Sequence, residues 1–401
     1  MTLGRIIYRS LRQHALSTCV AAASIALACA LAITVWVVKD QAQASFSQVS
    51  AGFDAVLGAR GSRLQLVLNA VFHLDASPGN ISQADYEEIA RHRAVLHAVP
   101  IAVGDNYRGF RLVGVPYESL AQVELTPGRT LQVAQGRAID SADAHEAVAG
   151  AYAARRLGLR VGDTFHPFHG LIYDEEQQHA ETYTVVGLLE PTNTPLDRVI
   201  LIPLAGVQTM SGHAAATSTD VSAVLIKLRT PIAGRSLDLL YNKQGNRLTF
   251  AWPIASVVGE LFGKIAWFQD VLALVAYGVA LVAIGSVLVS VYSSMTARRR
   301  DIAILRALGA RRATVFLAVL GESIATGLAG ACGGLLLHAG LMAVASHIIQ
   351  RETGVVLDAF SWAPVLAVVP AALLALCALA GLVPAWKAYR LPVADALVPV
   401  S

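Results

Sequence analysis

Residues 298–310 read RRRDIAILRALGA, and this basic segment separates two long stretches of sequence that are almost free of charge. Residues 271–297 before it and 323–350 after it contain no Asp, Glu, Lys or Arg, and the same holds for 15–38 and 359–386. A helix needs about 20 apolar residues to cross the hydrocarbon core of a membrane. The pattern therefore predicts transmembrane helices at residues 15–38, 268–294, 315–346 and 362–384.

The composition supports a membrane protein. Of the 401 residues, 55% are hydrophobic and 15% are charged, whereas about a quarter of the residues in a soluble domain are charged. The charge deficit is confined to the four apolar stretches, and residues 39–267 resemble a water-exposed domain. This composition argues against both an ordinary cytosolic enzyme and a disordered chain.

The first apolar stretch has an alternative interpretation as a signal peptide, because Ala42-Gln43-Ala44 resembles a small-x-small cleavage site. The apolar run is longer than the roughly 7–15 residues of a signal-peptide core, and Lys39 and Asp40 precede the site. We therefore predict a retained membrane helix.

The basic residues of the short flanking segments predict the orientation. Residues 1–14 hold three arginines and no acid, and residues 295–314 hold six arginines and one acid. The segment between the last two apolar stretches has one arginine and two acids. Both termini and residues 295–314 are thus expected in the cytoplasm, with 39–267 exported. The exported region is net negative, which argues against a nucleic-acid surface there.

The exported region alternates short strand patterns with short helix patterns, which predicts an α+β domain. All four cysteines lie in the apolar stretches, so this domain has no disulfide. Residues 82–93 read as a capped helix, with Ser82 at the cap and Asp85 three residues later. The apolar residues 58–75 have two interpretations, a segment buried in the core or an exposed surface for an apolar ligand or partner.

One loop of the exported region contains candidate metal ligands. His166, His169 and His179 flank three acidic residues, and imidazole and carboxylate groups both bind divalent metals. Their spacing matches no tight metal motif, so the expected role is a solvated loop, with metal binding as the alternative. No nucleophile motif such as G-x-S-x-G is present, and we assign no catalytic residue.

The basic segment carries a further pattern. Residues 301–308 place Ile302, Leu305 and Leu308 on one helix face and Arg306 on another. This predicts a short amphipathic helix just under the membrane, which Gly309 ends. A generic basic loop would explain the arginines but not this spacing.

The segment closely resembles the signature of the FtsX-like permease family, the MacB-type class of ABC transporters, which runs R-[RK]-[RK]-E-I-[AG]-[IL]-[LM]-[RK]-A-[LI]-G-A. The match is broken only at Asp301, where the usual Glu is replaced by a residue of the same charge. Residues 3–18 look like the family's elbow helix, 157–204 are similar to its exported core, and 391–397 resemble its usual ending.

The resemblance implies a fold with one membrane helix before a large α+β periplasmic domain and three helices after it. The implied parts other than the four membrane helices are a cytoplasmic elbow helix (1–14), a MacB-like periplasmic core domain (39–267), a cytoplasmic coupling-helix loop (295–314), a short periplasmic link (347–361) and a cytoplasmic tail (385–401). The implied location is the bacterial inner membrane.

The resemblance also implies that ATP is hydrolysed by a partner. The chain lacks a G-x-x-x-x-G-K-[ST] phosphate loop, so an ABC ATPase subunit would use ATP and Mg²⁺, and this chain would bind no cofactor. The residues implied to contact that ATPase are Arg299, Arg300, Asp301, Ile302, Leu305, Arg306, Leu308 and Gly309. Other implied partners are a second permease chain, identical or not, membrane lipids and, in some members, a periplasmic adaptor or binding protein, but no nucleic acid.

Glu322 is an acid inside a predicted membrane helix, where an ionised group is costly and usually faces protein or water. Structural pairing or snorkelling to the membrane surface is the expected role, and a substrate or proton role is the alternative.

The function implied by the resemblance is mechanotransmission, in which ATP hydrolysis moves the periplasmic domain to export or extract a periplasmic or outer-leaflet substrate. The alternatives are a signalling or regulatory module of the FtsX kind and a part of a metal-linked (zinc) transport system. The long exported region resembles transporter-like members more than the cell-division members, whose exported domain is usually smaller.

Overall fold

The structure is a computed structural model, and it describes residues 3–48, 52–125, 128–140, 144–170, 173–210, 219–297, 299–307, 309–353 and 363–390. The chain forms two compact units. The helical unit comprises Met1–Gln41, Ala266–Ser346 and Leu357–Ser401. The mixed unit comprises Ala42–Ile265 and His347–Val356.

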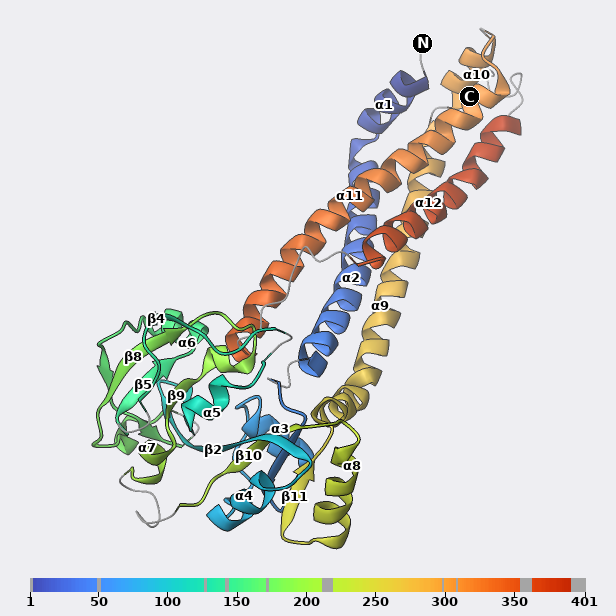
Figure 1. Ribbon diagram of the computed structural model, residues 1–401. Coiled ribbons are helices and arrows are strands. Elements are labelled where there is room, and N and C mark those ends of the chain that lie inside the picture. The colour runs from blue at the N-terminus through green and yellow to red at the C-terminus, as the bar shows by residue number, and fades with distance from the viewer. Residues whose placement is uncertain are drawn as a thin grey trace. The chain divides into compact units, whose positions relative to one another are not determined.

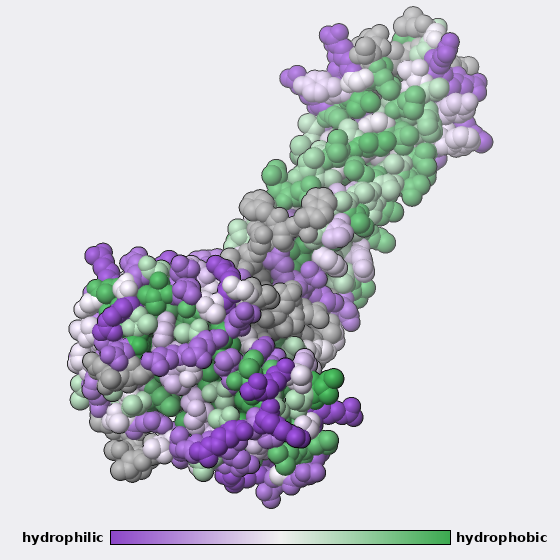
Figure 2. Space-filling model, viewed as in Figure 1, coloured by the Kyte–Doolittle hydropathy of each residue, from purple (hydrophilic) through white to green (hydrophobic). Residues whose placement is uncertain are grey.

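The predicted arrangement of four membrane helices, one before the mixed unit and three after it, is confirmed. The helices of this part of the chain are α1 (Leu3–Gln13), α2 (Ala15–Gln48), α9 (Ile254–Ala297), α10 (Arg299–Ala307), α11 (Arg312–Thr353) and α12 (Val365–Arg390) (Figure 1). By length and composition, the segments able to span a membrane are Ala15–Gln41, Asp270–Ala297, Arg312–Arg351 and Val365–Arg390. Figure 2 shows hydrophobic side chains along the middle of the helical unit and hydrophilic ones at the end that carries α1 and α10.

All four long helices extend beyond the membrane ranges predicted for them, and α2 continues to Gln48 and α12 to Arg390. α9 begins at Ile254, inside the predicted periplasmic domain, and α11 continues to Thr353. The predicted link 347–361 is therefore helical in its first half, and its remainder lies outside the described residues. Hydropathy marks the hydrocarbon core, and a helix can continue beyond that core where no helix breaker interrupts its hydrogen bonds. No proline occurs between Pro253 and Pro364.

Glycines bring α11 close to its neighbours. A Cβ built on Gly330 would lie 2.6 Å from the Cβ of Ile25 in α2, and one on Gly334 would lie 2.5 Å from the Cβ of Cys29. α12 also approaches α11 closely, and Ser323 Oγ of α11 donates a hydrogen bond of 2.5 Å to the backbone oxygen of Cys377 in α12. Small residues allow this close approach of helices in a membrane.

The mixed unit is built on one extended sheet whose strand order is β11-β1-β10-β2-β3-β9-β5-β8-β4, with β6 paired to β8 and β7 paired to β2. The strands are β1 (Ala55–Ala59), β2 (Val95–Tyr107), β3 (Phe110–Val115), β4 (Val133–Gly136), β5 (Glu146–Ala149), β6 (Thr164–Phe165), β7 (Phe168–His169), β8 (Tyr183–Leu189), β9 (Ile200–Pro203), β10 (Ala223–Leu228) and β11 (Leu248–Ala251). The pairings of β3 with β9 and of β5 with β8 are parallel and the others are antiparallel. The predicted α+β domain is thus confirmed.

Short helices cover this sheet. They are α3 (Arg63–Ala70), α4 (Gln83–Ala90), α5 (Tyr117–Ala121), α6 (Ala151–Leu157), α7 (Leu204–Gln208) and α8 (Ala233–Asp238). The predicted cap of α4 is present, because Ser82 and Asp85 form a capping box. The apolar segment 58–75 contains the end of β1 and all of α3, and Leu66, Val67 and Ala70 of α3 are buried in the main core. The core interpretation of this segment is therefore supported.

The long strand β2 joins the two halves of the sheet. Its first part pairs with β10, and its last part pairs with β3 and β7. The register between β2 and β3 shifts between Val103 and Asn106, which is where β2 also begins to pair with β7. This irregular stretch of β2 carries Asp105 into the second half of the sheet.

Candidate functional site

The amphipathic helix predicted from the signature segment is present as α10, Arg299–Ala307. Gly309 follows it with a φ of +97°, and its N–H donates a hydrogen bond of 3.1 Å to the backbone oxygen of Arg306. This left-handed backbone suits glycine. It ends the helix and leads the chain into α11.

α10 has a buried side and an exposed side. Ile302 and Ala303 are buried, Arg306 is half-buried, and Arg299, Arg300 and Ile304 are exposed. Leu308 and the side chains of Asp301 and Leu305 lie outside the described residues. The basic N-terminal turn of α10 thus faces away from the helical unit, while Ile302 packs into it.

Ile302 lines a small, mostly apolar cavity of about 60 Å³ within the helical unit. The other lining residues come from α1, α9, α11 and the turn before α11, and they are Ile6, Ile7, Ser10, Val291, Ser294, Met295, Ala310, Thr314, Val315, Ala318, Val319 and Glu322. The buried side of α10 therefore meets three other helices at one place.

Glu322 lies at this junction and is buried. Ser10 Oγ of α1 donates a hydrogen bond of 2.6 Å to Glu322 Oε2, and Ser10 Oγ lies 3.5 Å from Ser294 Oγ of α9. These contacts join α1, α9 and α11 through polar side chains in an apolar setting. They favour structural pairing, which is the role expected for Glu322, and the sequence pattern did not reveal the contacts of Ser10 and Ser294.

A second polar cluster lies in the mixed unit. Within the described residues, Asp105, His169 and His179 form a group that could hold a metal ion, with one ligand atom from each side chain and all three atoms within 4.8 Å of one another. The Nδ1 of His169 lies 3.2 Å from Asp105 Oδ1, and the Nε2 of His179 lies 3.1 Å from the same oxygen. The sequence pattern gives no sign of Asp105, because this residue is distant in sequence from the histidine-rich loop.

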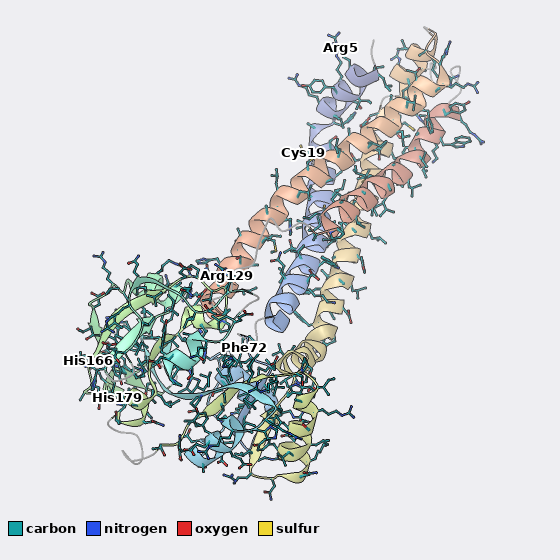
Figure 3. The ribbon with its side chains drawn as sticks, in the orientation of Figure 1. Arg5, Cys19, Phe72, Arg129, His166 and His179 are labelled. Carbon is teal, nitrogen blue, oxygen red and sulfur yellow. The ribbon has the colours of Figure 1, made fainter. Side chains whose placement is uncertain are left out.

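His166, the third histidine of the predicted loop, does not join this cluster. Its Nδ1 lies 3.1 Å from the backbone oxygen of Glu181. Figure 3 labels His166 and His179 in the same part of the mixed unit. The predicted loop thus brings two of its three histidines together, and it separates the third from them.

Comparisons with known proteins match both parts of the chain. A profile of the FtsX-like permease C-terminal domain matches residues 273–393, and a profile of the MacB-like periplasmic core domain matches residues 18–235. A sequence comparison with curated proteins finds no match.

Two solved structures are similar to part of the chain. The extracellular domain of the noncanonic ABC-type transporter YknZ from Gram-positive bacteria is 15% identical with a TM-score of 0.31, and the similarity covers 49% of this chain and 99% of that domain. The periplasmic region of MacB from Actinobacillus actinomycetemcomitans is 11% identical with a TM-score of 0.35, and the similarity covers 54% of this chain and 94% of that region. The two profile matches together leave little of the chain unassigned, and the periplasmic profile alone covers more than half of it. The chain therefore belongs to the family of FtsX-like ABC transporter permeases with a MacB-like periplasmic core domain.

Proposed function

We propose that this chain is the transmembrane subunit of an ABC transporter whose ATP hydrolysis occurs in a separate ATPase. In this proposal α10 docks on the ATPase in the cytoplasm, and ATP-driven movement of α10 is transmitted through the membrane helices to the exported domain. The domain then exports or extracts a substrate from the periplasm or the outer leaflet. Two permease chains would act together, in the inner membrane of a bacterium, with both chain termini in the cytoplasm.

The observation that carries this proposal is the continuity of α9. Its first turns place Ile254, Val257 and Val258 in the apolar core of the mixed unit, and its last residue, Ala297, lies two positions before Arg299, the first residue of α10. The 44 residues of α9 belong to both units, because the boundary between the units falls between Ile265 and Ala266. A single helix therefore links the core of the exported domain to the proposed ATPase-binding element.

The packing of α10 supports the same role. Ile302 and Ala303 tie the helix to the helical unit, so a displacement of α10 would be passed to the helices that it contacts. The exposed Arg299 and Arg300 offer positive charge to a partner surface. Exposed ion pairs each contribute little, so we expect these arginines to orient the contact and Ile304 to add apolar area.

Charge reversal on α10 tests the proposal. We expect the double variant Arg299→Glu/Arg300→Glu to weaken association with the ATPase by about tenfold or more, because like charges across an interface cost several kcal/mol. The measurement is co-purification of the ATPase and its hydrolysis rate in nanodiscs. Arg5→Glu is the matched control, since Arg5 is an exposed arginine of α1 in the same unit.

The control is expected to retain association and hydrolysis, and both variants are expected to insert in the membrane at the wild-type level. An α10 double variant that binds and stimulates the ATPase as the wild type does would contradict the docking role of α10.

A further inference from the structure

The cluster of Asp105, His169 and His179 has no role in the coupling mechanism proposed above. Asp105 lies on β2, His169 on β7, and His179 two residues after the 3₁₀ turn Glu175–Gln177. Both imidazoles approach the same carboxylate oxygen, and their rings meet edge to face with centroids 5.6 Å apart. Three segments of the mixed unit thus direct metal-ligating side chains to one point.

The main chain builds this arrangement. Asp105 and His169 are opposite each other in the antiparallel pairing of β2 with β7, and the N–H of Gly170 donates to the backbone oxygen of Gly104 at 2.8 Å. The N–H of His179 donates to the backbone oxygen of Pro167 at 2.9 Å. The positions of the three side chains are therefore set by backbone hydrogen bonds, which is the preorganisation that a binding site needs.

Side-chain contacts fix the same loop further. Asn106, adjacent to Asp105, donates from its Nδ2 to the backbone oxygen of Gly170 at 3.0 Å. Phe168, adjacent to His169, stacks with Tyr107 and meets Tyr173 edge to face. The residues next to two of the three candidate ligands are thus held in place by their own partners.

Two of the three distances between the candidate ligand atoms match the geometry of a metal site, and all three atoms lie within 4.8 Å of one another. Zinc binds imidazole nitrogen at about 2.0–2.1 Å and carboxylate oxygen at about 2.0–2.2 Å, in a tetrahedron whose ligand atoms are then about 3.4 Å apart. The two nitrogen-to-oxygen distances of 3.2 and 3.1 Å are close to this edge length. Three protein ligands leave one tetrahedral position for water or another ligand.

Burial and charge also favour a cation. The side chain of Asp105 is completely buried and that of His179 is 7% exposed, whereas that of His169 is 49% exposed. A buried carboxylate needs a compensating positive charge. The charge of Asp105 acts on nearby Arg111, which donates a hydrogen bond to the backbone oxygen of Asp75. A cation at the cluster would add positive charge beside the buried carboxylate, and the exposed side chain of His169 leaves the cluster open to solvent.

The loop between the two histidines adds negative charge near this opening. Asp174, Glu175 and Glu176 are all exposed on it. Clustered carboxylates raise the local concentration of cations. In this arrangement Asp174, Glu175 and Glu176 are not metal ligands. Their negative charge attracts the cation to the site.

We propose that Asp105, His169 and His179 form a site for a divalent transition-metal ion of the Zn²⁺ class, open to solvent on the exported domain. Imidazole and carboxylate together suit Zn²⁺, and they also accept Co²⁺ as a spectroscopic substitute. This inference goes beyond the proposed function and does not depend on ATPase coupling.

The test uses the full-length chain in nanodiscs, freed of metal and titrated with Zn²⁺ against a chromophoric chelator. We expect one Zn²⁺ per chain at micromolar or tighter affinity. Loss of an outer-shell partner already costs about 10–100-fold in metal affinity, so we expect His169→Ala to weaken binding about 100-fold or more. His166→Ala is the matched control, because His166 belongs to the same loop and lies outside the cluster.

Two further measurements separate binding from folding. Zn²⁺ should raise the Tm of the wild type, because a ligand that binds the native state stabilises it. His169→Ala and Asp105→Asn should lose this rise, and Co²⁺ should give an intense tetrahedral absorption band with the wild type and with His166→Ala only. A wild type that binds no Zn²⁺ at micromolar concentration would overturn the site, and so would either cluster variant that still binds stoichiometric Zn²⁺.

Discussion

Single residues show how the fold accommodates costly groups. Glu322 lies within a helix able to span a membrane, and the hydroxyl of Ser10 donates to its buried carboxyl group. His338 lies on the same helix, and its Nδ1 is 2.9 Å from Thr34 Oγ1 of α2. Both polar side chains are thus paired with hydroxyls of neighbouring helices, which is the usual arrangement for polar groups inside a membrane.

His73 is a buried histidine of the mixed unit with a backbone φ of +56°. Burial, with a smaller effect from the positive charge of Arg111, lowers the pKa of His73 to about 3. In the unfolded chain its pKa is about 6.5. The unfolded state therefore binds one more proton than the folded state between these pH values, and the free energy of unfolding falls as the pH drops below about 6.5.

We predict that His73→Asn makes the protein less sensitive to acid. Asn lacks the titratable ring and tolerates a positive φ. From pH 7.5 to pH 5 the histidine should cost the wild type about 2 kcal/mol that the variant does not lose. Thermal unfolding of both proteins at the two pH values measures this difference, and an equal fall in Tm would show that His73 does not titrate as described.

At the scale of elements, α11 depends on the position of its glycines. A Cβ on Gly330 would overlap with Ile25 of α2, whereas a Cβ on Gly340 would meet no described atom within 4 Å. Both glycines lie inside the same helix. They therefore separate the effect of helix contact from the effect of adding a methyl group to the helix.

We predict that Gly330→Ala destabilises the helical unit, because overpacking typically costs about 1–3 kcal/mol. Gly340→Ala should leave the Tm unchanged or raise it, since alanine favours a helix over glycine. Thermal unfolding in the same detergent compares the two variants with the wild type. Equal effects of the two substitutions would argue against close packing of α11 on α2.

At the scale of the whole molecule, the charge asymmetry of the flanking segments predicts the orientation of the chain in the membrane. Both ends of the described chain and α10 carry basic residues. Each of the four helices able to span a membrane would take the chain from one side of the membrane to the other. α10 should then face the cytoplasm, and the 3₁₀ turn Glu175–Gln177 of the mixed unit should face the opposite side.

Labelling of single cysteines in intact cells tests this orientation. In a cysteine-free chain, Glu175→Cys should react with a membrane-impermeant maleimide, because Glu175 is exposed on the mixed unit and the charge pattern predicts that this unit lies outside the cytoplasm. Arg300→Cys should react only after the inner membrane is opened. Labelling of both positions from the same side would exclude the proposed path of force from α10 to the mixed unit.

The sequence by itself determined the membrane helices, the α10 helix and the family. These features are local: a run of apolar residues, an amphipathic repeat and a short signature are complete within one segment of chain, so hydropathy and spacing reveal them. The sequence did not determine where the helices end. The charge-free stretch of α9 begins at residue 271, whereas the helix itself begins at Ile254.

The tertiary structure alone decided which polar groups meet. Asp105 reaches His169 and His179 through the pairing of β2 with β7, and Ser10 reaches Glu322 through the packing of α1 on α11. His166 is three residues from His169 but is bonded elsewhere. Such contacts depend on strand register and helix packing between segments far apart in the chain, and a register shift of one residue would turn each side chain to the opposite face.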